Sequence, residues 1–435
     1  MKKKHATFWN QAISKISRFI SENKLEILLF LIIFVIFLSS RFYRLEQKTG
    51  FEWDQVDNAW VAKNIIVDQK FPLLGMQAKG NSGFYIGPLY YYLVAFVYFL
   101  TNLDPIASGI LARITAVITF LVLYYVVRKI FDKNVALTAL VIYTFSNYAL
   151  VFDRIQWPVG FVFSISILIF YCLYRIICGS GKYLVLLGIV MGISFHIHFT
   201  SIFYPIIAFF CLPLFPRTRN TIFYGAFGLL IFLGFLLPFF IAEASSYGTH
   251  AKNFASYGTS YYHGFHIRRL LQLFFDAFIE FEGITKIDVI KRFGALIYLI
   301  FAYLLYKSKK FKEWKVMIYL SGLWILVPWI VFTTYSGEIS NYYFSMVRFI
   351  AVTSFAYIAV AILSARKTFL TVALLIFTFF WGYNNMYTFI NENEKGLAYY
   401  KKIVKEEIAN GRTIKFSEGD PRAYLYYIYK ERISK

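Results

Sequence analysis

A series of long, nearly uncharged apolar runs constrains this chain more than any other feature. A helix needs about 20 apolar residues to cross a bilayer core of about 30 Å. Runs of roughly this kind lie at 25–42, 105–127, 134–152, 158–177, 183–197, 199–215, 222–242, 293–306, 316–334, 347–364 and 368–385. Only 16% of the residues are charged, which argues against a soluble enzyme of this length. The sequence therefore predicts an all-α polytopic membrane protein with about 11 transmembrane helices.

The orientation of the chain in the membrane depends on residues 84–100, which are apolar but only marginally long enough to span. This stretch either lies along the membrane surface or crosses the membrane, and the positive-inside rule decides between these alternatives. If this stretch lies along the surface, short inner segments collect 20 of the 45 Lys and Arg residues. If it spans, the basic segment 307–315 faces outward. We expect surface-lying helices here, an inner amino terminus, an outer carboxyl terminus and a location in the plasma membrane.

This topology divides the chain into two parts. Residues 1–385 form the polytopic transmembrane domain, with long external loops at 43–104 and 243–292. Residues 386–435 form a small external tail, in which we expect a helix containing 398–408, a turn, a short strand and a second helix after Asp420-Pro421. The tail is too small to fold independently, so we expect it to dock on the outer loops.

The net charge of +21 raises the question of a nucleic-acid partner. The concentration of Lys and Arg in inner segments accounts for much of this excess, so we expect a membrane protein without a nucleic-acid partner. The three cysteines fit neither a metal motif nor a disulfide framework. We expect no metal site; a divalent metal stays open, but no ligand motif supports it.

Two carboxylates follow the first apolar run. Asp54 and Asp57 are three residues apart, so a helix would place them on one face. A carboxylate among aromatic rings near the membrane can have a shifted pKa and act as a general base. The alternative is an ordinary solvated helix start, because acidic residues are favoured in first turns. The two readings are equally supported by this segment alone.

A series of further motifs follows in order along the chain. They are Pro88-Leu89-Tyr90-Tyr91, Arg113, the segment 146–158, His198 and the segment 341–344. Together with Asp54, this order resembles the polyprenyl-phosphate-sugar-dependent branch of the glycosyltransferase-C superfamily, which includes protein O-mannosyltransferases and aminoarabinose transferases. The resemblance covers most of residues 25–350 and implies a glycosyltransferase-C-type fold.

The resemblance also implies roles for particular residues. Asp54 matches the family's catalytic aspartate, although Gln55 stands where several relatives have Glu. His198 matches a recurrent histidine, and Asp153 matches an acidic or polar position, so these two and Asp57 are candidates for catalytic support. For Asp153 the alternative is a helix-end carboxylate paired with Arg154.

The chemistry of this reaction needs cations as well as a base. The leaving phosphate gains charge, so fixed donors stabilise the transition state. Candidates to bind it are Arg113, Arg154, Arg348 and Lys79, whereas snorkelling to lipid headgroups is the alternative for each Arg. Candidates to line the sugar or lipid site are Tyr85, Trp157, Tyr342 and Tyr343, with an interfacial aromatic belt as the alternative.

Two functions are consistent with these features. The first is an inverting glycosyltransferase that moves a monosaccharide from a polyprenyl-phosphate carrier to a glycan, lipid or protein acceptor, with its active site outside. The alternative is a transporter or flippase of lipid-linked saccharides. A transporter is expected to carry ionisable residues or broken helices at mid-membrane. The polar residues here cluster near the predicted outer ends of the spans, which favours the enzyme.

Overall fold

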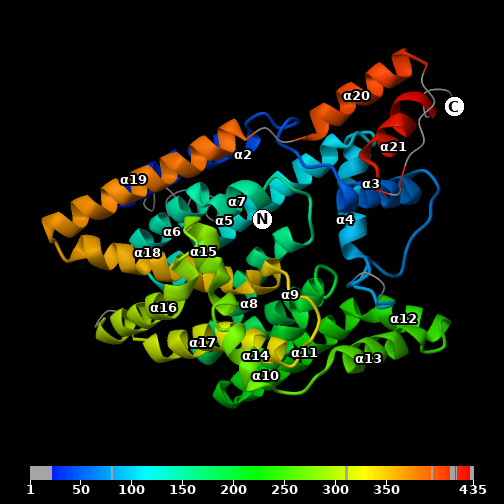
Figure 1. The fold of residues 1–435 in the computed structure, drawn as a ribbon. Coiled ribbons are helices and arrows are strands. Elements are labelled where there is room, and N and C mark those ends of the chain that lie inside the picture. The colour runs from blue at the N-terminus through cyan, green and yellow to red at the C-terminus, as the bar shows by residue number, and fades with distance from the viewer. Residues whose placement is uncertain are drawn as a thin grey trace, which may run out of the picture.

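The computed structural model describes residues 22–79, 82–308, 312–392, 395–411, 417 and 419–431, and these are almost entirely helical (Figure 1). The longer helices are α2 (Lys24–Phe42), α5 (Ile106–Ile130), α8 (Val159–Ile177), α11 (Arg219–Phe235), α16 (Ile290–Lys307), α17 (Trp314–Thr333), α18 (Arg348–Ser364) and α19 (Thr368–Asn391). The shorter ones are α3 (Trp53–Ile66), α4 (Leu89–Leu100), α6 (Lys133–Phe145), α7 (Asn147–Phe152), α9 (Tyr183–Ser194), α10 (Phe203–Cys211), α12 (Leu237–Ser245), α13 (Thr249–Tyr261), α14 (Ile267–Gln272), α15 (Ile279–Thr285), α20 (Leu397–Ala409) and α21 (Pro421–Tyr426). Brief helical turns are η1 (Phe199–Ile202), η2 (Leu212–Leu214), η3 (Asp276–Phe278), η4 (Asn341–Val347) and η5 (Tyr427–Glu431).

Helices occupy each of the predicted spans, and the all-α, polytopic prediction is confirmed. Six helices are long and apolar enough to cross a membrane, or up to eight if two bent helix pairs each count as one span. The bends are 45° between α11 and α12, and 96° between Ile267–Thr285 and α16. The predicted spans 134–152, 183–197 and 199–215 contain shorter apolar helices. The count of 11 and the direction of the chain stay predictions.

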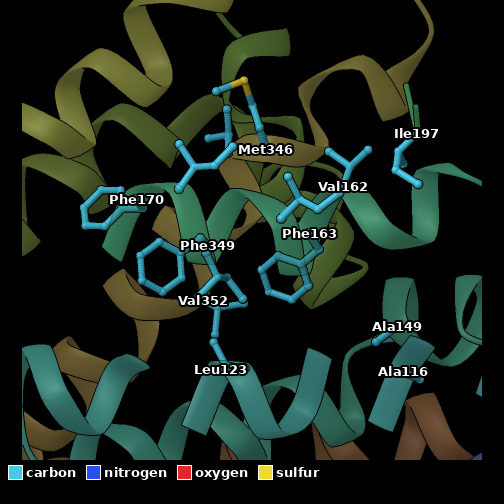
Figure 2. Packing of buried hydrophobic residues seen from close by; sticks show 14 of the residues in the cluster. Ala116, Leu123, Ala149, Val162, Phe163, Phe170, Ile197, Met346, Phe349 and Val352 are labelled. Carbon is cyan, nitrogen blue, oxygen red and sulfur yellow. The ribbon is translucent and has the colours of Figure 1, made fainter. Parts of the chain in front are cut away.

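Helix α8 lies at the centre of the helical assembly. In the most apolar stretch of α8, 72% of the residues are buried, compared with 17% in the corresponding stretch of α19. Figure 2 shows Phe163 and Phe170 of this helix packed among side chains of α18, with the rings of Phe170 and Phe349 5.0 Å apart. Ser166 links α8 to two further elements, because its hydroxyl donates to the Met346 carbonyl and accepts from Trp324. A fixed apolar core therefore supports the polar segments at the helix ends.

The segment 43–104 folds into two helices beside this core. Helix α3 begins with a capping box, in which the Glu52 side chain accepts from the backbone and the Gln55 side chain accepts from the Glu52 amide. Helix α4 has 12 residues, about 18 Å, and is shorter than a bilayer core. Its length agrees with a surface-lying helix, but α6 and α9 are equally short, so length alone does not decide its placement.

The carboxyl-terminal helices α20 and α21 contact the segment 43–104 (Figure 1). Lys401 of α20 pairs with Glu46 and Asp104 at 2.6 and 2.9 Å. Tyr424 of α21 is fully buried, and its hydroxyl donates to the Leu103 carbonyl at 3.1 Å. The two expected helices are therefore present and docked, whereas the expected short strand falls at 412–416, outside the described residues.

Candidate active site

Asp54 stands in the first turn of α3, two residues after the capping residue Glu52. Its side chain is half-buried, whereas Asp57, one turn later, is exposed. The capping box satisfies backbone amides of this first turn, so the helix start does not depend on the Asp54 carboxylate. That carboxylate is left for other partners.

Helix α3 is held against the segment that follows α7. The Gln55 amide donates to the Gln156 carbonyl at 2.9 Å, and the Gln156 amide donates to the Tyr90 hydroxyl at 2.7 Å. Next to this contact, Trp157 is close enough to Asp54 to lower the pKa of its carboxyl. Two consecutive residues of α3 therefore lie next to two consecutive residues of the segment that follows α7.

The electrostatic surroundings of Asp54 disfavour its charge. Burial raises the pKa of its carboxyl above the usual value, while the nearby Trp157 acts in the opposite direction. Burial, followed by the charges of Asp57 and Asp54, raises the pKa of Tyr91 to about 12. No basic side chain among the described residues contributes to the Asp54 shift. A carboxylate with a raised pKa and no neutralising cation is suited to accept a proton.

Ring contacts link Trp157 to the other predicted residues. The centroids of Trp157 and Tyr342 are 4.7 Å apart, and His198 lies 5.9 Å from Tyr342. The Lys79 ammonium lies 5.7 Å from the centroid of Tyr343. The structure thus joins Asp54, Trp157, Tyr342, Tyr343, His198 and Lys79 through a continuous series of contacts, which the sequence distributes over almost 300 positions.

A cavity of about 340 Å³ opens beside His198. Its walls are mostly apolar and come from residues 74–86, the region around η1, α12 and α13. The predicted residue Tyr85 lies in this wall, with its ring 5.6 Å from the His250 ring. Lys79 lines a neighbouring cavity of about 250 Å³ and donates to the Glu338 carbonyl at 3.0 Å. Lys79 and Tyr85 therefore stand where an apolar ligand with a charged end can enter.

Arg113 is placed differently, because it is completely buried. It donates to the carbonyls of Arg41, Gly109 and Arg154 and to the Thr49 hydroxyl, at 3.0–3.2 Å. These bonds connect the ends of α2 and α5 to the segment that follows α7. The geometry favours a structural brace, whereas a direct contact with phosphate stays a prediction.

Asp153 pairs with Arg41, whose Nε donates to it at 2.9 Å, and the Tyr143 hydroxyl donates to it at 3.1 Å. The suggested pairing of Asp153 with Arg154 is therefore wrong: Arg154 instead contacts Glu392 at 3.1 Å. The sequence could not show this, because Arg41 is 112 positions away from Asp153. The one feature of the sequence that pointed to this pair is Arg41, a lone arginine at the end of the first apolar run.

Arg348 forms a buried ion pair with Glu280 at 2.7 Å, and its guanidinium lies 3.8 Å from the Tyr148 ring centroid. The candidate phosphate ligand thus already has an anionic partner. Sequence reasoning did not identify this role of Glu280, nor the contact between Gln55 and Gln156. No group of three or more His, Cys, Asp or Glu side chains placed to hold a metal is found in the part of the chain that the structure describes.

Residues 86–241 match the family described as dolichyl-phosphate-mannose-protein mannosyltransferase. No curated protein matches the sequence. The fold is similar to that of ArnT from Cupriavidus metallidurans bound to undecaprenyl phosphate, with a TM-score of 0.62 and 10% identity over 93% of this chain and 85% of that one. It is also similar to the Archaeoglobus fulgidus oligosaccharyltransferase, with a TM-score of 0.53 and 15% identity over 91% of this chain and 57% of that one.

These matches agree with the resemblance that the sequence motifs indicated. The structural similarity extends over nearly the whole chain and establishes the fold. The family match adds the region from the Pro-Leu-Tyr-Tyr segment through α12, which includes Arg113, Trp157 and His198. The chain is therefore a multi-pass membrane protein with a fold similar to that of ArnT, and its residues 86–241 resemble the dolichyl-phosphate-mannose-protein mannosyltransferases.

Proposed function

We propose that this protein is an inverting glycosyltransferase that transfers a monosaccharide from a polyprenyl phosphate to an acceptor hydroxyl, with Asp54 as the general base. The observation that carries this proposal is the half-buried Asp54 carboxylate, which has a raised pKa and stands at one end of the series of aromatic contacts. In a single displacement, Asp54 takes the proton of the acceptor hydroxyl as its oxygen bonds to the anomeric carbon. The bond from that carbon to the phosphate oxygen breaks, and the polyprenyl phosphate leaves.

The two aromatic cavities support a lipid-linked donor. The larger one is lined by rings such as Phe84, Phe199 and Phe254, and it suits an isoprenoid chain. The structurally similar ArnT was crystallised with undecaprenyl phosphate. Lys79 is the first candidate to hold the phosphate, because it lines a cavity and donates to one carbonyl, whereas Arg113 is buried among several acceptors and Arg348 is paired with a carboxylate. An ammonium group at this position would stabilise the charge that the phosphate gains.

The orientation and the acceptor belong to the same proposal. The distribution of basic residues supports an active site on the outer face of the plasma membrane. The acceptor is a glycan, a lipid or a protein of the cell envelope.

The test is transfer of a labelled sugar by the purified protein in lipid nanodiscs, using synthetic polyprenyl-phosphate hexoses and pentoses as donors. Membrane extract from cells lacking the protein supplies the acceptors, and mass spectrometry identifies the product and the released polyprenyl phosphate. We expect Asp54→Asn to lower turnover at least a hundredfold, because general-base catalysis contributes about 10²–10⁴-fold. The matched control is Asp68→Asn, which removes an exposed carboxylate paired with Lys63. Near-wild-type turnover of Asp54→Asn would refute the assignment of the base.

A further inference from the structure

His198 lies directly before the short turn η1 and caps its start. Its Nδ1 lies 3.4 Å from the Thr200 amide nitrogen and 2.8 Å from the Thr200 hydroxyl. Because a backbone N–H can only donate, Nδ1 accepts in this contact and carries no proton. The hydrogen bond at one ring nitrogen sets the protonation of the other, so the neutral imidazole carries its proton on Nε2. His198 therefore presents a single N–H donor, at Nε2.

The Nε2 edge of this ring faces a cavity, whereas the Nδ1 edge is turned into the protein. Thr200 at the Nδ1 edge is only 3% exposed, and His198 lines the cavity of about 340 Å³. Three aromatic rings surround the imidazole with centroids 4.8–6.0 Å away, and they belong to Phe199, Tyr342 and Tyr343. Over the described ranges of the chain, Nε2 has no hydrogen-bond partner. A donor held at an apolar wall without an acceptor is suited to a ligand that brings one.

Lys79 reaches the same region from the neighbouring cavity. The Lys79 ammonium and the His198 ring lie 5.7 and 6.0 Å from the centroid of the Tyr343 ring. The two cavities also share a wall, which is formed by Phe84, Phe199, Ile202 and Phe254. The one carboxylate in the described walls of both cavities, that of Glu243, accepts from the Ala251 amide at 3.2 Å and pairs with neither donor. A ligand that contacts both Lys79 and His198 therefore needs an anionic group between apolar walls.

We propose that His198 binds the phosphate of the polyprenyl-phosphate donor as a neutral hydrogen-bond donor, through Nε2–H and together with Lys79. This inference rests on the proposed function and adds a second ligand for the phosphate. It differs from a role of His198 as an acid or a base, because Nδ1 is occupied by Thr200 and Nε2 keeps its proton. When the bond from the anomeric carbon to the phosphate oxygen breaks, the phosphate gains charge, and hydrogen bonds to it become stronger.

The first test measures binding and needs no catalysis. A synthetic polyprenyl phosphate and the matching polyprenol are titrated into the purified protein in detergent micelles, and calorimetry gives the dissociation constants. We expect His198→Leu to weaken binding of the phosphate about tenfold or more, because a hydrogen bond to a charged group is lost, and to leave binding of the alcohol unchanged. His198→Gln, whose side-chain amide donates, should recover most of the affinity. The matched control, His266→Leu, changes an exposed histidine that bonds the His263 carbonyl, and it should bind both lipids as the wild type does.

Two results would overturn the inference: His198→Leu weakens binding of both lipids equally, or it weakens binding of neither. Transfer kinetics give a further check, because replacing a proton-transferring residue by Gln would lower kcat about a hundredfold or more. We expect His198→Gln to recover transfer, and a loss of that size would contradict the role as a neutral donor. If His198→Leu discriminates between the lipids but Asp54→Asn retains transfer, the phosphate site stands and the assignment of the base fails. If the lipids are not discriminated but Asp54→Asn abolishes transfer, the proposed function stands and this inference fails.

Discussion

The buried pair between Arg348 and Glu280 gives a prediction that the structure makes quantitative. Its side chains are only 8% and 1% exposed, and Nε and Oε2 are 2.7 Å apart. At an effective dielectric of about 20, the gross Coulomb attraction at this distance is about 6 kcal/mol. The cost of removing both charges from water offsets much of it. Removing one partner of such a pair typically costs about 3–5 kcal/mol, because the remaining charge stays buried without compensation.

We therefore expect Arg348→Met and Glu280→Leu each to lower the free energy of unfolding by about 3–5 kcal/mol. The double variant should recover most of this loss, since apolar side chains of similar volume can replace a buried pair at little cost. The matched control is Lys402→Ala, which breaks an exposed pair with Glu406 at 3.9 Å and should cost below about 0.5 kcal/mol.

The assay is equilibrium unfolding in mixed detergent–SDS micelles, analysed as a double-mutant cycle. The prediction is refuted if each single variant lowers the free energy of unfolding by less than about 1 kcal/mol, or if the two losses simply add in the double variant. Such a result would mean that the buried charge of Arg348 does not need the Glu280 carboxylate. Arg348 would then again be a candidate to bind the phosphate.

Two further predictions concern the donor site. Lys79→Ala should raise the KM for the donor about tenfold or more through the loss of a charged hydrogen bond, whereas Lys79→Arg should stay close to wild type; an unchanged KM in Lys79→Ala would exclude a phosphate contact. Tyr85→Cys, in a background in which Cys172, Cys178 and Cys211 are replaced, should react with a membrane-impermeant thiol reagent from the outer side alone. Labelling from the cytoplasmic side would instead favour the transporter alternative.

The sequence by itself determined the class of fold. Runs such as 105–127 and 158–177 require a helical membrane protein, because the bilayer leaves no partner for an unpaired backbone amide. It also identified Asp54, Trp157 and Lys79 as candidates, because their residue types and order match the needs of a sugar transfer from phosphate. These inferences depend on composition and order along the chain, which the sequence states directly.

Only the tertiary structure decided which charges are free for chemistry. In the sequence, Arg113, Arg348 and Lys79 are equivalent cations near the ends of apolar runs. The fold gives Arg113 three backbone carbonyls and Arg348 a buried carboxylate, and it leaves Lys79 beside an aromatic cavity. Partners such as Arg41 for Asp153 are more than 100 positions apart, so no local pattern records them. A buried charge must find a partner wherever the fold supplies one, and that pairing is a property of packing rather than of residue order.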